Sequence, residues 1–214
     1  MLDSRKDWVP GSFRLLPLAC LVFLSACVTT PSDPEVGDLQ AWRARMELLR
    51  TIDQWALNGR LAVAGDQVED AQGKISWRQS DEQYRLNVRG PFGVGATRIT
   101  GDSTGVEVRN KKGRFSAENP EAALRQQLGW DVPLGALRFW VLGRPAPEGF
   151  ADLRFDAEGQ LLSMEQQGWL VSYLEYARSK ADAVSLPRRL MATREGVAVR
   201  LAVDRWNPGK PEQR

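Results

Sequence analysis

Histidine is absent from this 214-residue sequence, and cysteine occurs only at positions 20 and 27. Without histidine the chain can form neither a Ser-His-Asp nor a Cys-His catalytic centre, and it lacks the side chain that most often binds transition metals. The charge is nearly balanced, with 29 basic and 27 acidic residues, and no block of like charge stands out. The composition therefore predicts no nucleic-acid binding and points to no metal or other cofactor.

Long apolar runs are also lacking. An apolar stretch near the amino terminus, from Leu15 to Leu24, follows three basic residues. At about 10 residues it is too short to span a membrane, but it has the length of the hydrophobic region of a signal peptide. Its end, Leu24-Ser25-Ala26-Cys27, resembles the lipobox of bacterial lipoproteins, in which two small residues precede a cysteine that receives a diacylglyceryl group. Cys20 is a competing site, but the residues before it fit the pattern less well.

The sequence therefore predicts four segments. Residues 1–26 are expected to be a cleaved signal peptide, and residues 27–36 a flexible tether whose Cys27 carries N-acyl and S-diacylglycerol groups. Residues 37–206 fit one domain, and residues 207–214 are expected to be a disordered tail. The alternative is a secreted protein with a chance cysteine near an alanine cleavage site. Removal of Cys20 and acylation of Cys27 would leave no thiol for a disulfide.

Most of the remaining chain alternates apolar and polar residues with a period of two, broken by turn residues such as Gly65-Asp66 and Gly101-Asp102. This pattern is typical of antiparallel strands with one buried face. The predicted strands are 55–63, 74–78, 84–89, 94–100, 106–109, 114–117, 151–156, 160–166, 169–177, 185–192 and 197–204.

Three segments have helical spacing instead. Apolar residues recur every three or four positions from Leu39 to Leu49. Asn119-Pro120-Glu121 is a helix start signal, and Pro133 opens a short helix that Gly143 ends. The expected order is helix, six strands, two helices, five strands. We expect a mainly β fold, an open, curved antiparallel half-barrel of about eleven strands with a helical lid over an apolar cavity; a closed barrel and a sandwich are the alternatives.

Four stretches then resemble one family, the outer-membrane lipoprotein receptor LolB. They are Tyr84–Gly93, in which a Pro, a large apolar residue and a Gly follow a strand, Val106–Gly113, Val132–Pro145, and Gln166 to Tyr176. The third is the most specific, with Pro-Leu followed by Leu-Arg, Trp, Leu-Gly and Pro. Together with the lipobox, the likeness covers essentially the whole mature chain.

The resemblance implies a receptor rather than an enzyme. Such a receptor takes lipoproteins from the periplasmic carrier LolA, binds their acyl chains in an apolar cavity, and delivers them to the inner leaflet of the outer membrane without nucleotide or metal. Val28 follows the lipidated cysteine, where an Asp would signal retention in the inner membrane, so the resemblance is consistent with an outer-membrane anchor facing the periplasm. We expect a monomer.

The resemblance also implies roles for particular residues. Phe92, between Pro91 and Gly93, would be the loop residue that enters the membrane, although a ring in such a loop can equally tuck into the core. The lid motif would be Leu137, Arg138, Trp140 and Gly143, in which Arg138 either bonds backbone carbonyls or meets an ester or carboxylate of the cargo. The cavity candidates, for each of which ordinary core is the alternative, are Trp55, Leu57, Leu61, Val63, Trp77, Leu86, Val88, Trp140, Val199 and Leu201.

Two other functions fit the residues alone. One is binding of a different apolar ligand without transfer. The other is hydrolysis of envelope polysaccharide by a pair of carboxylates facing each other in the concavity.

Overall fold

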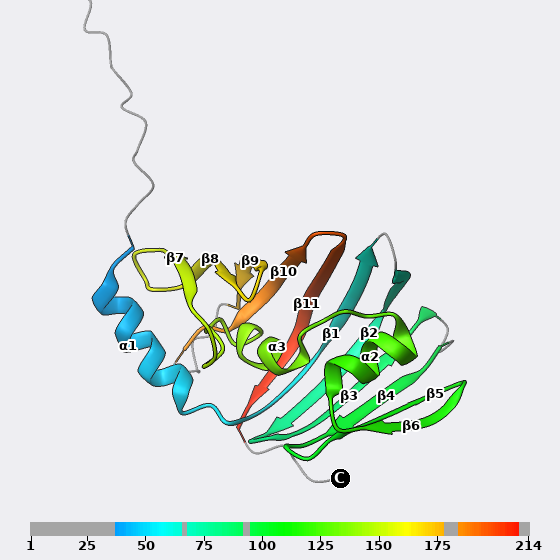
Figure 1. Cartoon of the computed structure of the whole chain (residues 1–214). Coiled ribbons are helices and arrows are strands. Elements are labelled where there is room, and N and C mark those ends of the chain that lie inside the picture. The colour runs from blue at the N-terminus through cyan, green and yellow to red at the C-terminus, as the bar shows by residue number, and fades with distance from the viewer. Residues whose placement is uncertain (1–36, 66–67, 92–94, 178–183, 210–214) are drawn as a thin grey trace, which may run out of the picture. The chain divides into compact units, whose positions relative to one another are not determined.

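The alternating segments form a single antiparallel sheet of eleven strands, accompanied by three helices (Figure 1). The computed structural model describes residues 37–65, 68–91, 95–177 and 184–209, which lie within the compact unit Asp33–Arg214. The helices are α1 (Leu39–Arg50), α2 (Pro120–Leu128) and α3 (Leu134–Trp140). The strands are β1 (Gln54–Gly65), β2 (Val68–Ser80), β3 (Gln83–Arg89), β4 (Thr97–Gly101), β5 (Val106–Asn110), β6 (Gly113–Ala117), β7 (Ala151–Phe155), β8 (Leu161–Gln166), β9 (Trp169–Tyr176), β10 (Pro187–Arg194) and β11 (Val197–Pro208).

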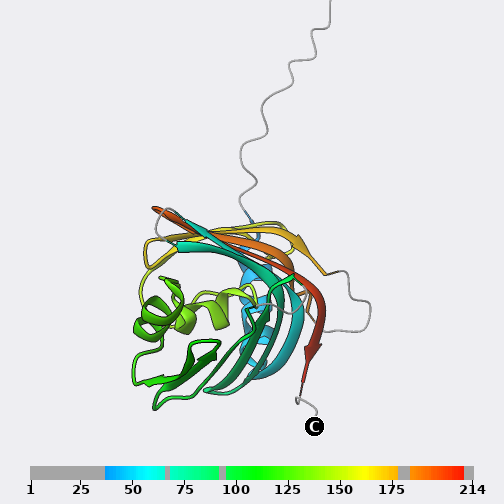
Figure 2. The ribbon, with the colours of Figure 1, turned by 90° about the vertical axis from the view of Figure 1, so that its right-hand side faces the viewer.

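The strand order β6-β5-β4-β3-β2-β1-β11-β10-β9-β8-β7 joins two meanders through the pairing of β1 with β11, where Leu61 lies opposite Leu201. In the described part of the chain, β6 and β7 are edge strands that do not pair with each other, so the sheet stays open. Figure 2 shows it curving around α2 and α3. The predicted element order and the open half-barrel are confirmed, and the closed barrel and the sandwich are excluded.

Several predicted strand boundaries differ from those observed, and two were wrong by four residues or more. β2 begins at Val68, well before the predicted start at Lys74, because pairing with β1 extends a segment whose own residues show no alternation. β11 runs to Pro208, with Asn207 opposite Ala56, so these two residues belong to the sheet rather than to the predicted tail. The signal-peptide and tether segments lie outside the described residues.

The predicted start signal of α2 is present, and two further caps are seen that were not predicted, at Asp38 and Gly129. The Asn119 side chain accepts a hydrogen bond from Ala122 N at 2.8 Å and so caps α2, while Gly129 ends that helix in the left-handed conformation. Asp38 caps α1 in the same way through Gln40 N and Ala41 N. Side-chain caps thus fix where α1 and α2 begin, whereas α3 has no side-chain cap at its start, and packing stabilises all three helices.

Helix α1 packs against the hairpin of β7 and β8. The Trp42 ring stacks on the Phe155 ring with 5.4 Å between centroids, and Gly159 in the hairpin turn lies directly against the α1 backbone. A β-carbon at Gly159 would meet Trp42 N at 2.5 Å and Ala41 C at 2.6 Å, and its φ of +70° is one that residues other than glycine rarely adopt.

We expect Gly159→Ala to destabilise the protein by more than about 1 kcal/mol, because it combines a strained φ with a clash against α1. The midpoint of thermal unfolding, followed by circular dichroism, should fall by at least roughly 2–4 °C. Gly135→Ala is the control, since a β-carbon there meets only Glu121 Oε1, at 3.5 Å. A Gly159→Ala protein that melts with or above the Gly135→Ala protein would contradict this packing.

Candidate functional site

The inward-facing residues of the strands meet in rows across the concave face of the sheet. Leu57 lies opposite Trp77, Trp77 opposite Leu86, and Leu86 opposite Ile99. Val63 lies opposite Val199 on the other side of β1. Side chains directly opposite one another on the same face are in contact distance, so these rows form a continuous apolar surface.

All ten cavity candidates lie on this surface or on the helix that covers it. Nine of them are no more than 7% exposed, and Leu61 is half-buried. They belong to one hydrophobic cluster with Leu124 of α2 and Leu134 and Leu137 of α3. In this structure, therefore, they are packed together with the helices, in the arrangement of an ordinary core.

The concave face presents no carboxylate among the described residues. The buried polar residues in that part of the chain are Arg45, Gln79, Thr97 and Gln166. A hydrolase of the kind considered above requires two facing acids, and these residues supply none. Nor do the described residues contain a group of three or more Cys, Asp or Glu side chains placed to hold a metal ion.

Trp140 attaches α3 to the sheet. Its side chain is fully buried, its indole Nε1 donates to Gln166 Oε1 at 2.8 Å, and its carbonyl accepts from the Tyr173 hydroxyl at 2.9 Å. Its ring also packs against Trp169, with 6.3 Å between centroids. Burial raises the pKa of Tyr173 well above 10, so this hydroxyl stays a donor at any physiological pH.

Gln166 is a buried residue beside the site to which the sequence analysis gave no role of its own. Only 2% exposed, it accepts from Trp140 and from Ala146 N, and its amide donates to the carbonyls of Ala146 and Glu148. It thereby fixes both α3 and the segment after it. A signal was present, because Gln166 occupies an inward position of an otherwise apolar strand face.

Arg138 connects the lid helix to the turn between β2 and β3. Its Nη1 donates to Glu82 Oε2 at 2.7 Å and to the Asp81 carbonyl at 3.5 Å, and its guanidinium lies over the Phe139 ring. One backbone carbonyl and a carboxylate of the protein itself are thus within reach of Arg138, and its predicted role in anchoring the lid stays a prediction. Gly143, with φ of +78°, ends the lid motif against Pro187 and Tyr176.

A second set of polar contacts fixes the segment between α2 and α3. Asp131 forms ion pairs with Arg125, at 2.6 Å, and with Arg194 of β10. The hydrogen bond from Arg125, together with the charge of Arg194, holds the pKa of Asp131 below its ordinary value. Both lid contacts are partly exposed, and exposed ion pairs are worth only about 0–1 kcal/mol each.

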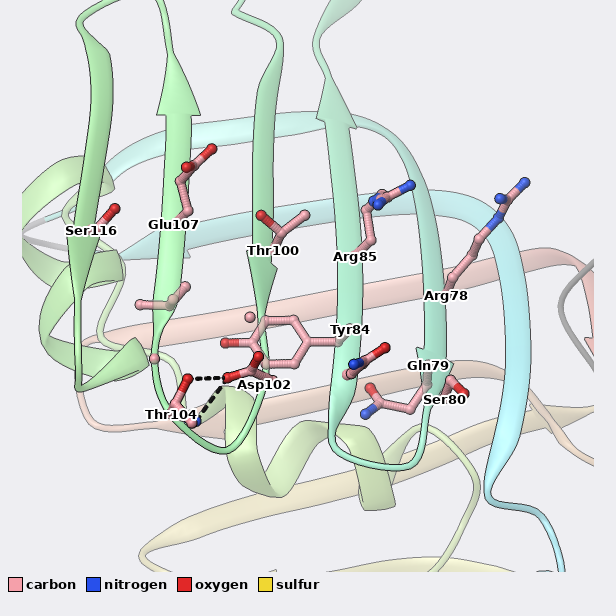
Figure 3. Close-up of a pocket in the computed structure, with 14 residues that line it drawn as sticks. Arg78, Gln79, Ser80, Tyr84, Arg85, Thr100, Asp102, Thr104, Glu107 and Ser116 are labelled. Carbon is pink, nitrogen blue, oxygen red and sulfur yellow. Dashed lines mark hydrogen bonds between the residues drawn. The ribbon is translucent and has the colours of Figure 1, made fainter. Parts of the chain in front are cut away.

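A hollow of about 460 Å³ opens at the ends of β2 to β6 and is too polar for acyl chains (Figure 3). Arg78, Arg85 and Glu107 line it, and the Asp102 carboxylate there accepts hydrogen bonds from Thr104. Tyr84 also lines it, and burial raises the pKa of that phenol to about 12. We therefore assign no acyl chain to this hollow.

The predicted membrane-contacting residues are only partly described. Pro91 is exposed and follows β3 after Gly90, whereas Phe92 and Gly93 lie outside the described residues, as does the predicted lipidation site Cys27. In the described part of the chain, no helix has both the length and the apolar character needed to cross a membrane.

Residues 53–206 match the sequence profile of a family described as "Outer membrane lipoprotein LolB". The chain belongs to the LolB family. The LolB of Chromohalobacter salexigens is 37% identical over 192 residues, which cover 89% of this chain and 88% of that protein. A LolB from Pseudomonas putida is 39% identical over 174 residues, covering 80% of this chain and 83% of that protein.

A solved structure supports the fold. The LolA superfamily protein of Nitrosomonas europaea superposes with a TM-score of 0.52 at 9% identity, covering 80% of this chain and 93% of that one. At this identity the likeness shows only that this chain and that protein have a similar fold. The most specific LolB-like stretch, Val132–Pro145, forms α3 and its flanks, and Gln166 to Trp169 spans the turn between β8 and β9.

We expect Gln166→Leu to destabilise the protein by on the order of 3 kcal/mol, because buried groups of Trp140, Ala146 and Glu148 lose their hydrogen-bond partner. The midpoint of thermal unfolding should fall by roughly 6–12 °C. Gln83→Leu, at an exposed position of β3, is the control and should change little. Equal melting of the two variants would show that Gln166 does not hold the lid.

Proposed function

We propose that this protein is a lipid-anchored receptor of the outer membrane that accepts lipoproteins from LolA, holds their acyl chains against the concave face, and inserts them into the inner leaflet. The observation that carries the proposal is the continuous apolar face of an open sheet, covered by helices rather than by another sheet. Helices held by a few polar contacts can separate from a sheet, whereas a closed barrel offers no such opening.

The energetics favour such an exchange. Acyl chains would take the place of the apolar side chains that α2 and α3 press against the sheet, so the concave face would lose little apolar contact when the lid opens. The polar contacts that hold the lid are the Arg138–Glu82 and Asp131–Arg194 pairs, each weak because it is partly exposed, and the buried hydrogen bonds of Trp140 with Gln166 and Tyr173, which break only if Trp140 moves with the lid. Burying about ten CH₂ groups of one acyl chain contributes on the order of 8 kcal/mol relative to water, which exceeds what the two ion pairs contribute.

The lipid on Cys27 serves in this proposal as a tether and takes no part in binding. Transfer needs no nucleotide, because cargo moves from the carrier to a better apolar site and then to the bilayer, the best apolar solvent of the three. Lipid extracted from the purified protein would distinguish this function from the binding of an unrelated apolar ligand.

A form that starts at residue 28 tests acceptance. It keeps the whole compact unit Asp33–Arg214, including the core that would receive acyl chains. We expect it to take radiolabelled lipoprotein from LolA, measured by separating the two proteins after mixing. Liposomes added next should receive the label. If the anchored protein accepts cargo and this form does not, the lipid anchor belongs to the binding site. The proposed separation between a tether and a binding domain is then wrong.

Phe92→Glu tests delivery. The proposal puts an apolar ring at the point where cargo enters lipid, and inserting one such ring is worth about 1.5–3 kcal/mol, enough to orient a tethered protein. Acceptance from LolA should persist while delivery to liposomes fails. Phe150→Glu is the matched control, since Phe150 is an exposed ring in another loop, 88% accessible. Normal delivery by Phe92→Glu would show that Phe92 is not the membrane-inserting residue. Unfolding of that variant would indicate that the ring belongs to the core.

A further inference from the structure

The outward face of the central strands carries a row of basic residues. Arg89 of β3 lies opposite Lys74 of β2, and Lys74 lies opposite Arg60 of β1. Arg60 in turn lies opposite Ala202 of β11, which lies opposite Arg189 of β10. All four basic side chains are exposed. Four of the five positions across five adjacent strands therefore hold a cation.

This row of cations lowers the stability of the folded protein. Like charges directly opposite each other on neighbouring strands repel, and three consecutive strands place cations in that relation. Arg60 is balanced by Asp204 at 3.0 Å, and Arg189 by Glu175 at 3.2 Å. Lys74 and Arg89 form no ion pair with the described residues, nor does Arg200 in the next row. A repulsive arrangement that folding does not need suggests a binding role.

The same face is hollowed and partly apolar. A groove of about 940 Å³ includes the five cations Arg60, Lys74, Arg89, Arg189 and Arg200, together with Leu174 and Met191, and reaches Pro91. Leu174 is 65% exposed, and Leu170, on the same face of β9, is 42% exposed. Cations beside exposed leucines match the two layers of a membrane surface, in which anionic headgroups lie above acyl chains.

We propose that this convex face binds anionic phospholipid headgroups. The positive charge of the groove favours anionic headgroups. The exposed leucines beside it favour a membrane surface over an acidic protein as the partner. The proposal rests on the function above, because a chain tethered to a bilayer meets this surface continually. Binding here would bring the end of β3, at Arg89 and Pro91, to the membrane, and would add to what a single apolar ring can contribute.

The test uses the form that starts at residue 28 and two kinds of vesicle, phosphatidylcholine alone and phosphatidylcholine with a third replaced by phosphatidylglycerol. Co-sedimentation should show stronger binding to the anionic vesicles, lost as salt rises. The double change Lys74→Glu with Arg89→Glu should weaken that binding by roughly tenfold or more. Equal binding of the unchanged protein to both vesicles would overturn the proposal.

The matched control is Arg43→Glu with Arg154→Glu. It makes the same change in net charge at two exposed positions on α1 and β7, and should bind anionic vesicles like the unchanged protein. Equal weakening by both double variants would mean that net charge, and not this face, governs binding. Thermal unfolding checks that each variant is folded. The double change Lys74→Gln with Arg89→Gln removes charge without reversing it, and it should give an intermediate loss of binding to anionic vesicles.

Acceptance of lipoprotein from LolA is measured on the same proteins, so the two proposals fail separately. If Lys74→Glu with Arg89→Glu accepts cargo but no longer prefers anionic vesicles, both proposals stand. If that variant binds vesicles normally and loses acceptance, the face is a docking surface for the carrier and the membrane proposal is wrong. If the unchanged protein prefers anionic vesicles yet never accepts cargo, the receptor function fails while the lipid-binding face stands.

Discussion

An open sheet with one apolar face must keep that face covered, and the rest of this structure follows from that constraint. The eleven strands bury their inward side chains, but the sheet does not close on itself, so α2 and α3 supply the missing wall. Apolar packing provides the energy of this cover, while a small set of polar contacts fixes its position. Gln166 and Arg138 are the clearest examples, the first deeply buried and the second near the surface.

Much of the fold was predictable because local rules and packing agree. Periods of two and of three to four residues identified every strand and helix in order, and Asn119-Pro120 marked the start of α2. The strand β2 was underestimated since its first half shows no alternation and owes its conformation to pairing with β1. Asn207 and Pro208 were assigned to the tail for the same reason. Pairing partners are a property of the fold, and no local pattern reveals them.

The site was predictable as a surface but not as a mechanism. Alternation alone places Leu57, Trp77 and Leu86 on one face, and that is where they lie. Alternation cannot tell a filled interior from an empty one, because both require the same apolar residues. The contacts that hold the lid join positions far apart in sequence, such as Arg138 and Glu82, so the charges could be noticed but not their pairing.

The same alternation gives the sheet a second, separate surface. Each strand that offers a leucine or a tryptophan inward must offer its neighbouring residues outward, and in β1, β2 and β3 these are Arg60, Lys74 and Arg89. The backbone lies between the two faces, so the side chains of one face are mostly separated from those of the other, although Leu61 and Leu201 also border the groove on the outer face. The two proposals use this separation, since one assigns acyl chains to the inner face and the other assigns the membrane to the outer face. A period of two along each strand is enough to provide both surfaces.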